Sequence, residues 1–199
     1  MQPLFTNNIP LLSVWLVSVL IWRVIEVGVD IRTFKRFRAG IQRRDRGSHV
    51  VIICLVGFGV LIGVLLAFKL PATSITSARV FLFWLGILLI YAGIALRLYA
   101  IIVLGAFFTT AVAVAAGQTV VETGPYRLIR HPAYTGFLLT LLGFALSLTN
   151  WLSLLVIMGC ALTGLSYRIH VEERVLQEHL GQPYQEYMRR TKRLIPFIL

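Results

Sequence analysis

Residues 124–136 have the sequence GPYRLIRHPAYTG, the longest interruption between two membrane-length apolar segments in the second half of the chain. Pro125 and Pro132 fix their own φ angles and disfavour helix at the residue before each. Gly124 and Gly136 permit backbone geometries that other residues resist. The stretch therefore predicts a shaped loop that leads into a helix. Its tyrosines, arginines and histidine can meet both an aromatic face and an anion.

The composition around this stretch is that of a membrane protein. The chain has 199 residues, of which 58% are apolar, and its mean hydropathy is +0.83, far above the range of soluble domains. The net charge of +11 resembles that of nucleic-acid-binding proteins. The basic residues lie beside apolar segments, however, so we interpret them as orienting the protein and meeting anionic lipid, with no nucleic-acid partner. No cleavable signal peptide is expected, because basic residues follow the first apolar run and none precedes it.

Five apolar runs predict an all-α, polytopic transmembrane helical bundle of about five spans. The runs cover residues 9–29, 50–68, 79–104, 134–149 and 151–168, and a span needs about 20 apolar residues. Asn150 alone separates the last two, which predicts a tight helical hairpin. The two cysteines, Cys54 and Cys160, lie inside apolar runs and are interpreted as packing residues.

The chain divides into two predicted regions. Residues 1–104 form three N-terminal transmembrane helices with a basic loop at 31–47, and residues 105–199 form a catalytic, cofactor-binding region with the hairpin and an amphipathic C-terminal tail. Residues 105–123 are only mildly apolar and are interpreted as an interfacial segment. The positive-inside rule places the 31–47 loop in the cytoplasm, hence the N-terminus outside and the C-terminus inside. The 124–136 stretch and the charged tail then share the cytoplasmic side.

Three charged residues fall near the ends of the first and third spans. Arg23 and Glu26 have i,i+3 spacing, which favours an interfacial ion pair. Arg97 is near the end of its span, and a charge at the centre of a span costs about 2.5–3.5 kcal/mol on insertion scales. We therefore expect Arg97 either to snorkel or to face a cavity. The sequence leaves that choice open.

A second polar cluster follows the hairpin. If the last span continues as helix, Arg168 and Glu172 are i,i+4 and share a face, whereas Glu173 is rotated by about 100°. A helix-end salt bridge is the simplest interpretation, and a functional site at the membrane boundary is the alternative. The chain has no phosphate-binding loop, no nucleophile elbow and no helical histidine pair for a metal site. His131 alone is more typical of a structural histidine than of a general base.

Taken together, these motifs resemble the isoprenylcysteine carboxyl methyltransferase family, and a chain of this size is similar to its short prokaryotic members. The resemblance covers about residues 117–197. It consists of the G-x-Y-x3-R-H-P-x-Y-x-G element, Arg168 with the double glutamate, and the GQPYQEYMRRTKRLIP tail. It implies an integral membrane enzyme, in a prokaryotic inner membrane, that uses S-adenosylmethionine and releases S-adenosylhomocysteine. It also implies a cofactor pocket in the C-terminal half, open to the cytosol.

The resemblance further implies roles for individual residues. Arg168 and Glu172 fall where the family has an arginine and a glutamate linked to substrate and catalysis. The residues implied for cofactor binding are Gln118, Thr119, Val120, Val121, Tyr126, Arg130, His131, Pro132, Ala133, Tyr134 and Glu173. No metal is implied. Methyl transfer from a sulfonium depends mainly on positioning, an arginine can hold a carboxylate bidentately, and Tyr126 and Tyr134 can face the sulfonium.

The methyl acceptor stays open at this point. A carboxylate on a lipophilic, isoprenylcysteine-like or prenylated substrate that enters from the bilayer is our first expectation, with membrane lipids as the surroundings. A phospholipid or amine N-methyltransferase would use Glu172 or Glu173 as a base. A membrane reductase that binds NADPH and a non-catalytic lipid-binding protein are the further alternatives. The sequence does not indicate an oligomeric state.

Overall fold

The computed structural model describes residues 2–37, 42–43, 47–110, 113–114 and 117–195. Six α-helices carry the described chain, and four of them are long and apolar enough to cross a membrane. These four are α1 (Ile9–Phe37), α2 (Ser48–Lys69), α3 (Arg79–Leu104) and α5 (Trp151–Leu180). The other two are α4 (Pro132–Ser147) and α6 (Gln182–Arg190), and the short elements are η1 (Pro71–Thr73), η2 (Gly105–Phe107), η3 (Gly124–Arg127), β1 (Gln42–Arg43) and β2 (Ala113–Val114).

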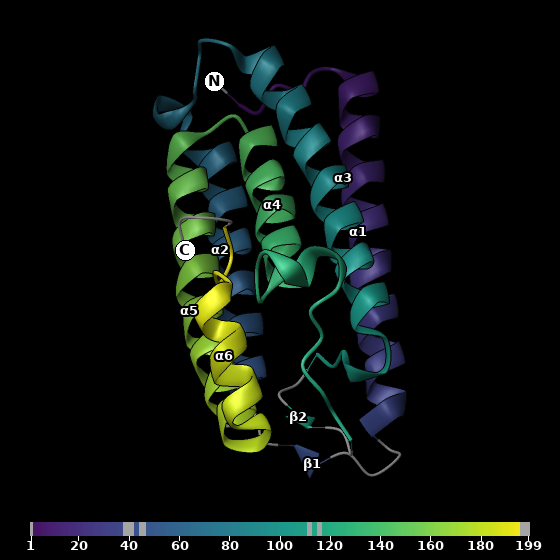
Figure 1. Ribbon diagram of the computed structural model, residues 1–199. Coiled ribbons are helices and arrows are strands. Elements are labelled where there is room, and N and C mark those ends of the chain that lie inside the picture. The colour runs from purple at the N-terminus through teal and green to yellow at the C-terminus, as the bar shows by residue number, and fades with distance from the viewer. Residues whose placement is uncertain (1, 38–41, 44–46, 111–112, 115–116, 196–199) are drawn as a thin grey trace.

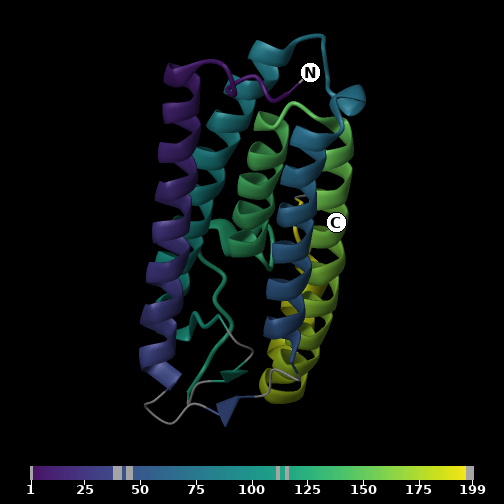
Figure 2. The same ribbon diagram turned by 180° about the vertical axis from the view of Figure 1, so that it is seen from behind.

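The long helices form a bundle around the central helix α4 (Figure 1). Helix α3 packs along α4, α2 packs along α5, and α1 lies against α3. Seen from behind, α1 and α2 stand on opposite sides with α4 visible between them (Figure 2). The fold is therefore an all-α membrane bundle, as predicted, with one antiparallel pairing of β1 with β2 as its described sheet.

The predicted hairpin is present, but its first arm is short. Helix α4 has 16 residues, or about 24 Å at 1.5 Å per residue, against a hydrocarbon core of about 30 Å. Pro132 is its first residue, where a missing N–H costs no hydrogen bond. Helix α4 consequently begins near the middle of the bundle rather than at its end (Figure 1). The 124–136 stretch therefore enters the bundle, with Tyr126 and His131 buried while Leu128 stays exposed.

Close contact between α3 and α4 depends on glycines. A Cβ on Gly93 would lie 2.5 Å from the carbonyl oxygen of Gly136, and one on Gly136 would lie 2.6 Å from the backbone nitrogen of Arg97. Gly86 and Gly143 meet in the same way one layer further along. Small residues at these four positions let the two backbones touch, which fixes where α4 begins relative to α3.

Two helices extend beyond their predicted ends. Helix α1 continues to Phe37, so the first part of the predicted 31–47 loop is helical, and most of the remainder lies outside the described residues. Helix α5 runs without a break from Trp151 to Leu180, so the predicted amphipathic segment is the continuation of the last span. No glycine or proline interrupts residues 165–180, and Gly181, with φ of 60°, ends the helix.

The predicted pairing of Arg23 with Glu26 is replaced by a contact between helices. Glu26 Oε1 lies 2.8 Å from Arg97 Nε, Glu26 Oε2 accepts from Arg97 Nη2 at 2.9 Å, and both side chains are at most 13% exposed. Arg97 Nη1 also donates to the carbonyl oxygen of Ala133 at 3.0 Å, and its guanidinium lies 5.1 Å from the centroid of the Phe137 ring. Arg97 is thus buried and does not snorkel, because α1 and α4 supply partners for its donors.

Candidate functional site

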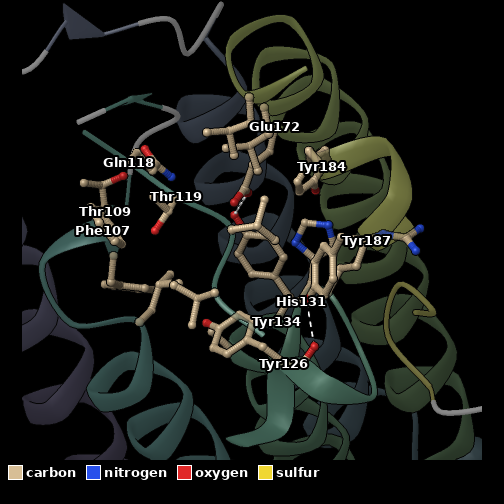
Figure 3. A pocket seen from close by; sticks show the side chains of 18 residues that line it. Phe107, Thr109, Gln118, Thr119, Tyr126, His131, Tyr134, Glu172, Tyr184 and Tyr187 are labelled. Atoms are coloured by element: carbon tan, nitrogen blue, oxygen red, sulfur yellow. Dashed lines mark hydrogen bonds between the residues drawn. The ribbon is translucent and has the colours of Figure 1, made fainter. Parts of the chain in front are cut away.

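The first cavity is a cleft bounded by the end of α3, residues 107–109 and 118–134, the last turns of α5, and α6 (Figure 3). Its volume is about 90 Å³. Aromatic rings and short polar side chains dominate its walls, and Glu172 is the acidic residue among them. The lining residues are Leu104, Phe107, Phe108, Thr109, Gln118, Thr119, Val120, Val121, Tyr126, Arg130, His131, Ala133, Tyr134, Glu172, Leu176, Leu180, Tyr184 and Tyr187.

Tyr134 joins the two residues that sequence analysis linked to catalysis. Its hydroxyl donates to Glu172 Oε2 at 2.5 Å and accepts from Arg168 Nε at 3.1 Å. Arg168 is 2% exposed and also donates to Ser48 Oγ at 2.8 Å and to the carbonyl oxygen of Thr110 at 2.6 Å. The predicted direct pairing of Arg168 with Glu172 is therefore mediated by a tyrosine from the 124–136 stretch. The guanidinium is fixed on three sides.

The second cavity lies on the other side of Tyr134, between α1 and α2, and its volume is about 450 Å³. Arg168 lies in its wall together with five other acidic or basic residues, and the rest of the lining is mainly apolar. The lining residues are Trp15, Val19, Trp22, Arg23, Glu26, Asp30, His49, Ile52, Ile53, Val56, Gly57, Val60, Arg97, Phe108, Thr109, Thr110, Tyr134, Phe137, Phe144 and Arg168. Phe108, Thr109 and Tyr134 line both cavities, so the two spaces adjoin at these residues.

Glu173 lies behind the first cavity, in a cluster of basic side chains. Its Oε1 is 2.9 Å from Arg130 Nε and 3.3 Å from His131 Nε2, and its Oε2 is 3.0 Å from Arg193 Nη2. The carboxylate is 3% exposed and is not among the residues that line the cleft. Glu173 therefore pairs with basic side chains, and its contact with a cofactor stays a prediction. The rotation between adjacent helical positions sends its side chain behind Glu172.

The chain after α6 is bound to the 124–136 stretch through its backbone. Arg130 N donates to the carbonyl oxygen of Lys192 at 2.7 Å, and His131 N donates to that of Arg193 at 3.0 Å. The Arg130 guanidinium also donates to the carbonyl oxygens of Met188 and Thr191. These bonds hold α6 beside the cleft and tie the Arg130 guanidinium to the C-terminal end of α6.

The tyrosines of the cleft outside the spans are neutral donors. Burial raises the pKa of Tyr126, Tyr184 and Tyr187 above the ordinary value for phenols, with nearby carboxylates acting in the same direction. The Tyr187 hydroxyl donates to the carbonyl oxygen of Tyr126 at 2.7 Å, which ties α6 to the loop (Figure 3). The cleft is thus lined by protonated phenols and one carboxylate.

The part of the chain that is similar to known proteins includes the 124–136 stretch and the Arg168–Glu173 cluster. Residues 84–178 match the model of the isoprenylcysteine carboxyl methyltransferase (ICMT) family. The match covers just under half of the chain. Over 120 residues it is 31% identical to a protein of Oryza sativa subsp. indica named "Probable protein-S-isoprenylcysteine O-methyltransferase", covering 59% of this chain and 63% of the rice protein. Over 116 residues it is 36% identical to the protein-S-isoprenylcysteine O-methyltransferase of Saccharomyces cerevisiae, covering 57% and 48% of the two chains.

A solved structure of the family has a similar fold. It is that of the eukaryotic intramembrane Ras methyltransferase ICMT, with a TM-score of 0.56, 25% sequence identity, and coverage of 77% of this chain and 53% of that one. The matches with the rice and yeast relatives extend over about half to two thirds of their lengths. Together with the four helices long and apolar enough to cross a membrane, the similarity indicates an integral membrane protein whose fold resembles that of ICMT.

The structure brings most of the implied site residues together. Ten line the first cavity: Gln118, Thr119, Val120, Val121, Tyr126, Arg130, His131, Ala133, Tyr134 and Glu172. Arg168 lines the second cavity, and Pro132 is buried at the start of α4. Sequence reasoning did not assign Phe107, Phe108 or the α6 tyrosines Tyr184 and Tyr187. The G-x-x-Y-x-x-Y pattern of the tail could have identified the last two, because their i,i+3 spacing places both on one helical face.

Proposed function

We propose that the chain is a membrane methyltransferase that moves a methyl group from S-adenosylmethionine to the carboxylate of a lipophilic, isoprenylcysteine-like acceptor. The observation that carries this proposal is the position of the Tyr134 hydroxyl. It lies between Arg168 on the wall of a large, mainly apolar cavity and Glu172 on the wall of an aromatic cleft. Donor and acceptor would therefore meet at one tyrosine from opposite sides.

The residues of the first cavity fit a sulfonium nucleoside. Aromatic faces attract cations, and the tyrosines of the cleft surround the one carboxylate, Glu172, which can balance a positive charge. Gln118 and Thr119 add polar side chains of the kind that recognise ribose or amino-acid groups (Figure 3). A volume of about 90 Å³ is below the usual range of about 300–1,000 Å³ for ligand pockets. We therefore expect the walls to separate when the nucleoside binds.

The chain's own residues supply the positioning that the reaction needs. The cofactor contributes an electrophilic methyl group on sulfur, and a carboxylate acceptor is ionised at neutral pH without a base. The Arg168 guanidinium faces the second cavity and is held by Tyr134, Ser48 and Thr110, so it can orient the acceptor without first being ordered. Glu172 holds the Tyr134 hydroxyl. Such pre-ordering is the main contribution available to an in-line displacement.

An amine acceptor is the second candidate, and Glu172 is the observation that favours it. Its carboxylate is the acidic group of the first cavity and could accept the proton of an ammonium group before methylation. The two acceptors give products of different stability. A methyl ester is hydrolysed by mild base, whereas a methylated amine is not.

Two measurements test the proposal. Calorimetry in detergent with S-adenosylhomocysteine should show binding that Tyr134→Ala weakens, whereas Tyr167→Ala should not, because the Tyr167 ring is 42% exposed and lines neither cavity. Binding of NADPH in place of S-adenosylhomocysteine would indicate a reductase. Transfer of tritiated methyl groups to membrane extract should then give a base-labile product. A base-stable product would establish the amine acceptor, and binding without any transfer would leave a lipid-binding protein.

We also propose an orientation for the chain in a prokaryotic inner membrane. The C-terminal ends of α1 and α5, which precede the basic segments, lie together at one end of the bundle (Figure 1). Positive charge near spans favours the cytoplasm, so this end, with the first cavity, would face inward and the N-terminus outward. Tags at the two termini should be accessible from opposite sides of sealed vesicles, and labelling from one side alone would refute this arrangement.

A further inference from the structure

The second cavity is elongated along the helices and has two unlike ends. On α1 its lining extends from Trp15 to Asp30, and on α2 from His49 to Val60. At 1.5 Å per residue these stretches correspond to about 22 Å and 16 Å. Arg168 and Tyr134 lie at the polar end, where the first cavity begins. The space therefore extends along both helices, far enough to hold an elongated apolar chain.

The far end of this cavity is formed by aromatic rings in fixed positions. The Trp15 and Phe144 rings lie 5.7 Å apart, and the Trp15 ring stacks on Phe5 at 4.6 Å. Trp15 Nε1 donates to Ser147 Oγ at 2.8 Å, which fixes the indole through its polar atom as well. Phe5 and Phe144 are both buried. An indole held by two rings and a hydrogen bond does not turn aside readily, so it limits how far a chain can extend.

We propose that Trp15 and Phe144 form a stop that sets the maximum length of the prenyl chain carried by the acceptor. The proposal rests on the proposed function for the identity of that chain. The chain lies between α1 and α2 with its first carbons near Tyr134 and its last carbons against the Trp15 ring. A chain that reaches the stop fills the cavity and binds most tightly. A longer one must bend out between α1 and α2 and loses contact.

Two residues can shorten the cavity from opposite walls. Val19 is on the cavity side of α1, four residues and hence about 6 Å from Trp15, and Val60 is near the same end on α2. Val19→Trp and Val60→Phe should each lower the length limit. Trp15→Leu should raise it. Leu20→Trp is the matched control for Val19→Trp, because Leu20 is 62% exposed on the outer side of α1 and lines neither cavity.

The test measures binding, so it does not depend on methyl transfer. S-geranyl-, S-farnesyl- and S-geranylgeranyl-cysteine methyl esters, which carry no free carboxylate, are titrated calorimetrically into the detergent-solubilised protein. In the wild type, affinity should rise with chain length up to a limit. Val19→Trp and Val60→Phe should weaken the longest chain that the wild type accepts by about tenfold or more, as expected for lost apolar contacts in a pocket. The geranyl compound should be affected less than about threefold.

Several results would overturn the stop. The first is equal affinity of the wild type for all three prenyl chains, and the second is an equal loss of affinity for all three chains in both Val19→Trp and Val60→Phe. The third is a chain-length limit that shifts as far in Leu20→Trp as in Val19→Trp. Native mass spectrometry adds a check on the occupant, because a phospholipid that no prenyl compound displaces would also contradict the proposal. Failure of the proposed function would look different. Length-dependent binding would persist while no methyl group was transferred to the corresponding free acids.

Discussion

Replacing Tyr134 by phenylalanine removes one oxygen atom at the junction of the two cavities. That oxygen makes two hydrogen bonds to charged groups, at 2.5 Å to Glu172 and at 3.1 Å to Arg168. A hydrogen bond to a charged group contributes about 1.5–3 kcal/mol. Arg168 keeps its bonds to Ser48 and Thr110, so we count one such bond, about 2 kcal/mol, as the loss. This corresponds to a fall of about 30-fold in kcat/KM for the acceptor.

The cofactor side should be much less affected in this variant. The ring of residue 134 stacks on His131 with centroids 5.5 Å apart, and phenylalanine retains that contact. The assay compares methyl transfer to S-farnesylcysteine with the Kd of S-adenosylhomocysteine in the same preparation. Tyr167→Phe is the matched control, because Tyr167 is 42% exposed and lines neither cavity, so this change should leave both quantities as they are in the wild type. Unchanged turnover in Tyr134→Phe, or an equal loss of cofactor affinity, would refute the assigned role.

Three further predictions concern stability. Glu26→Gln leaves the buried Arg97 charge without its carboxylate partner and should lower the free energy of unfolding by about 3–5 kcal/mol, seen as a lower thermal midpoint. Combining Glu26→Gln with Arg97→Met should recover part of this loss. If Glu26→Gln alone melts at the wild-type temperature, the burial of the pair is contradicted. Gly93→Ala should lower the thermal midpoint, because its Cβ would meet the backbone of Gly136 and Thr140. Gly159→Ala is the control and should leave the midpoint unchanged, because nothing lies within 4 Å of its added Cβ. Equal thermal midpoints for the two variants would argue against the close α3–α4 contact. Burial raises the pKa of Tyr126, Tyr184 and Tyr187, so the folded state disfavours their ionisation. These groups should not affect the free energy of unfolding below pH of about 10, and should lower it as the pH rises further. If the thermal midpoint of Tyr187→Phe falls with alkaline pH as steeply as that of the wild type, Tyr187 does not contribute to this effect.

Much of the fold could be predicted, because a segment that crosses a bilayer as a helix must be long and apolar. Apolar length alone identified α1, α2 and α3, and Asn150 marked the turn between α4 and α5, where its side chain caps α5 by accepting from Ser153 N. The depth at which α4 begins could not be predicted. It depends on the contact of Gly93 with Gly136. The sequence of either helix alone does not show which glycine of the other helix it will meet.

The candidate site shows the same division. The 124–136 stretch indicated which residues gather around the cleft, because its prolines and glycines fix a local shape. The partners of buried charges were not predictable from spacing. Arg97 pairs with Glu26, 71 residues away, and Glu173 pairs with Arg130, 43 residues away. Helical periodicity relates a residue only to neighbours within a turn or two, so such pairs become visible only once the helices are assembled.

The two cavities draw their walls from different parts of the chain. The first is built from residues 104–109 and 118–134, α5 and α6, whereas α1 and α2 supply most of the second. The family match begins at residue 84 and so leaves α1 and α2 outside it. Substitutions in these two helices can therefore reshape one compartment while the other keeps its form. This separation gives the scaffold a modular character, in which the apolar half can diversify or be redesigned without rebuilding the aromatic cleft.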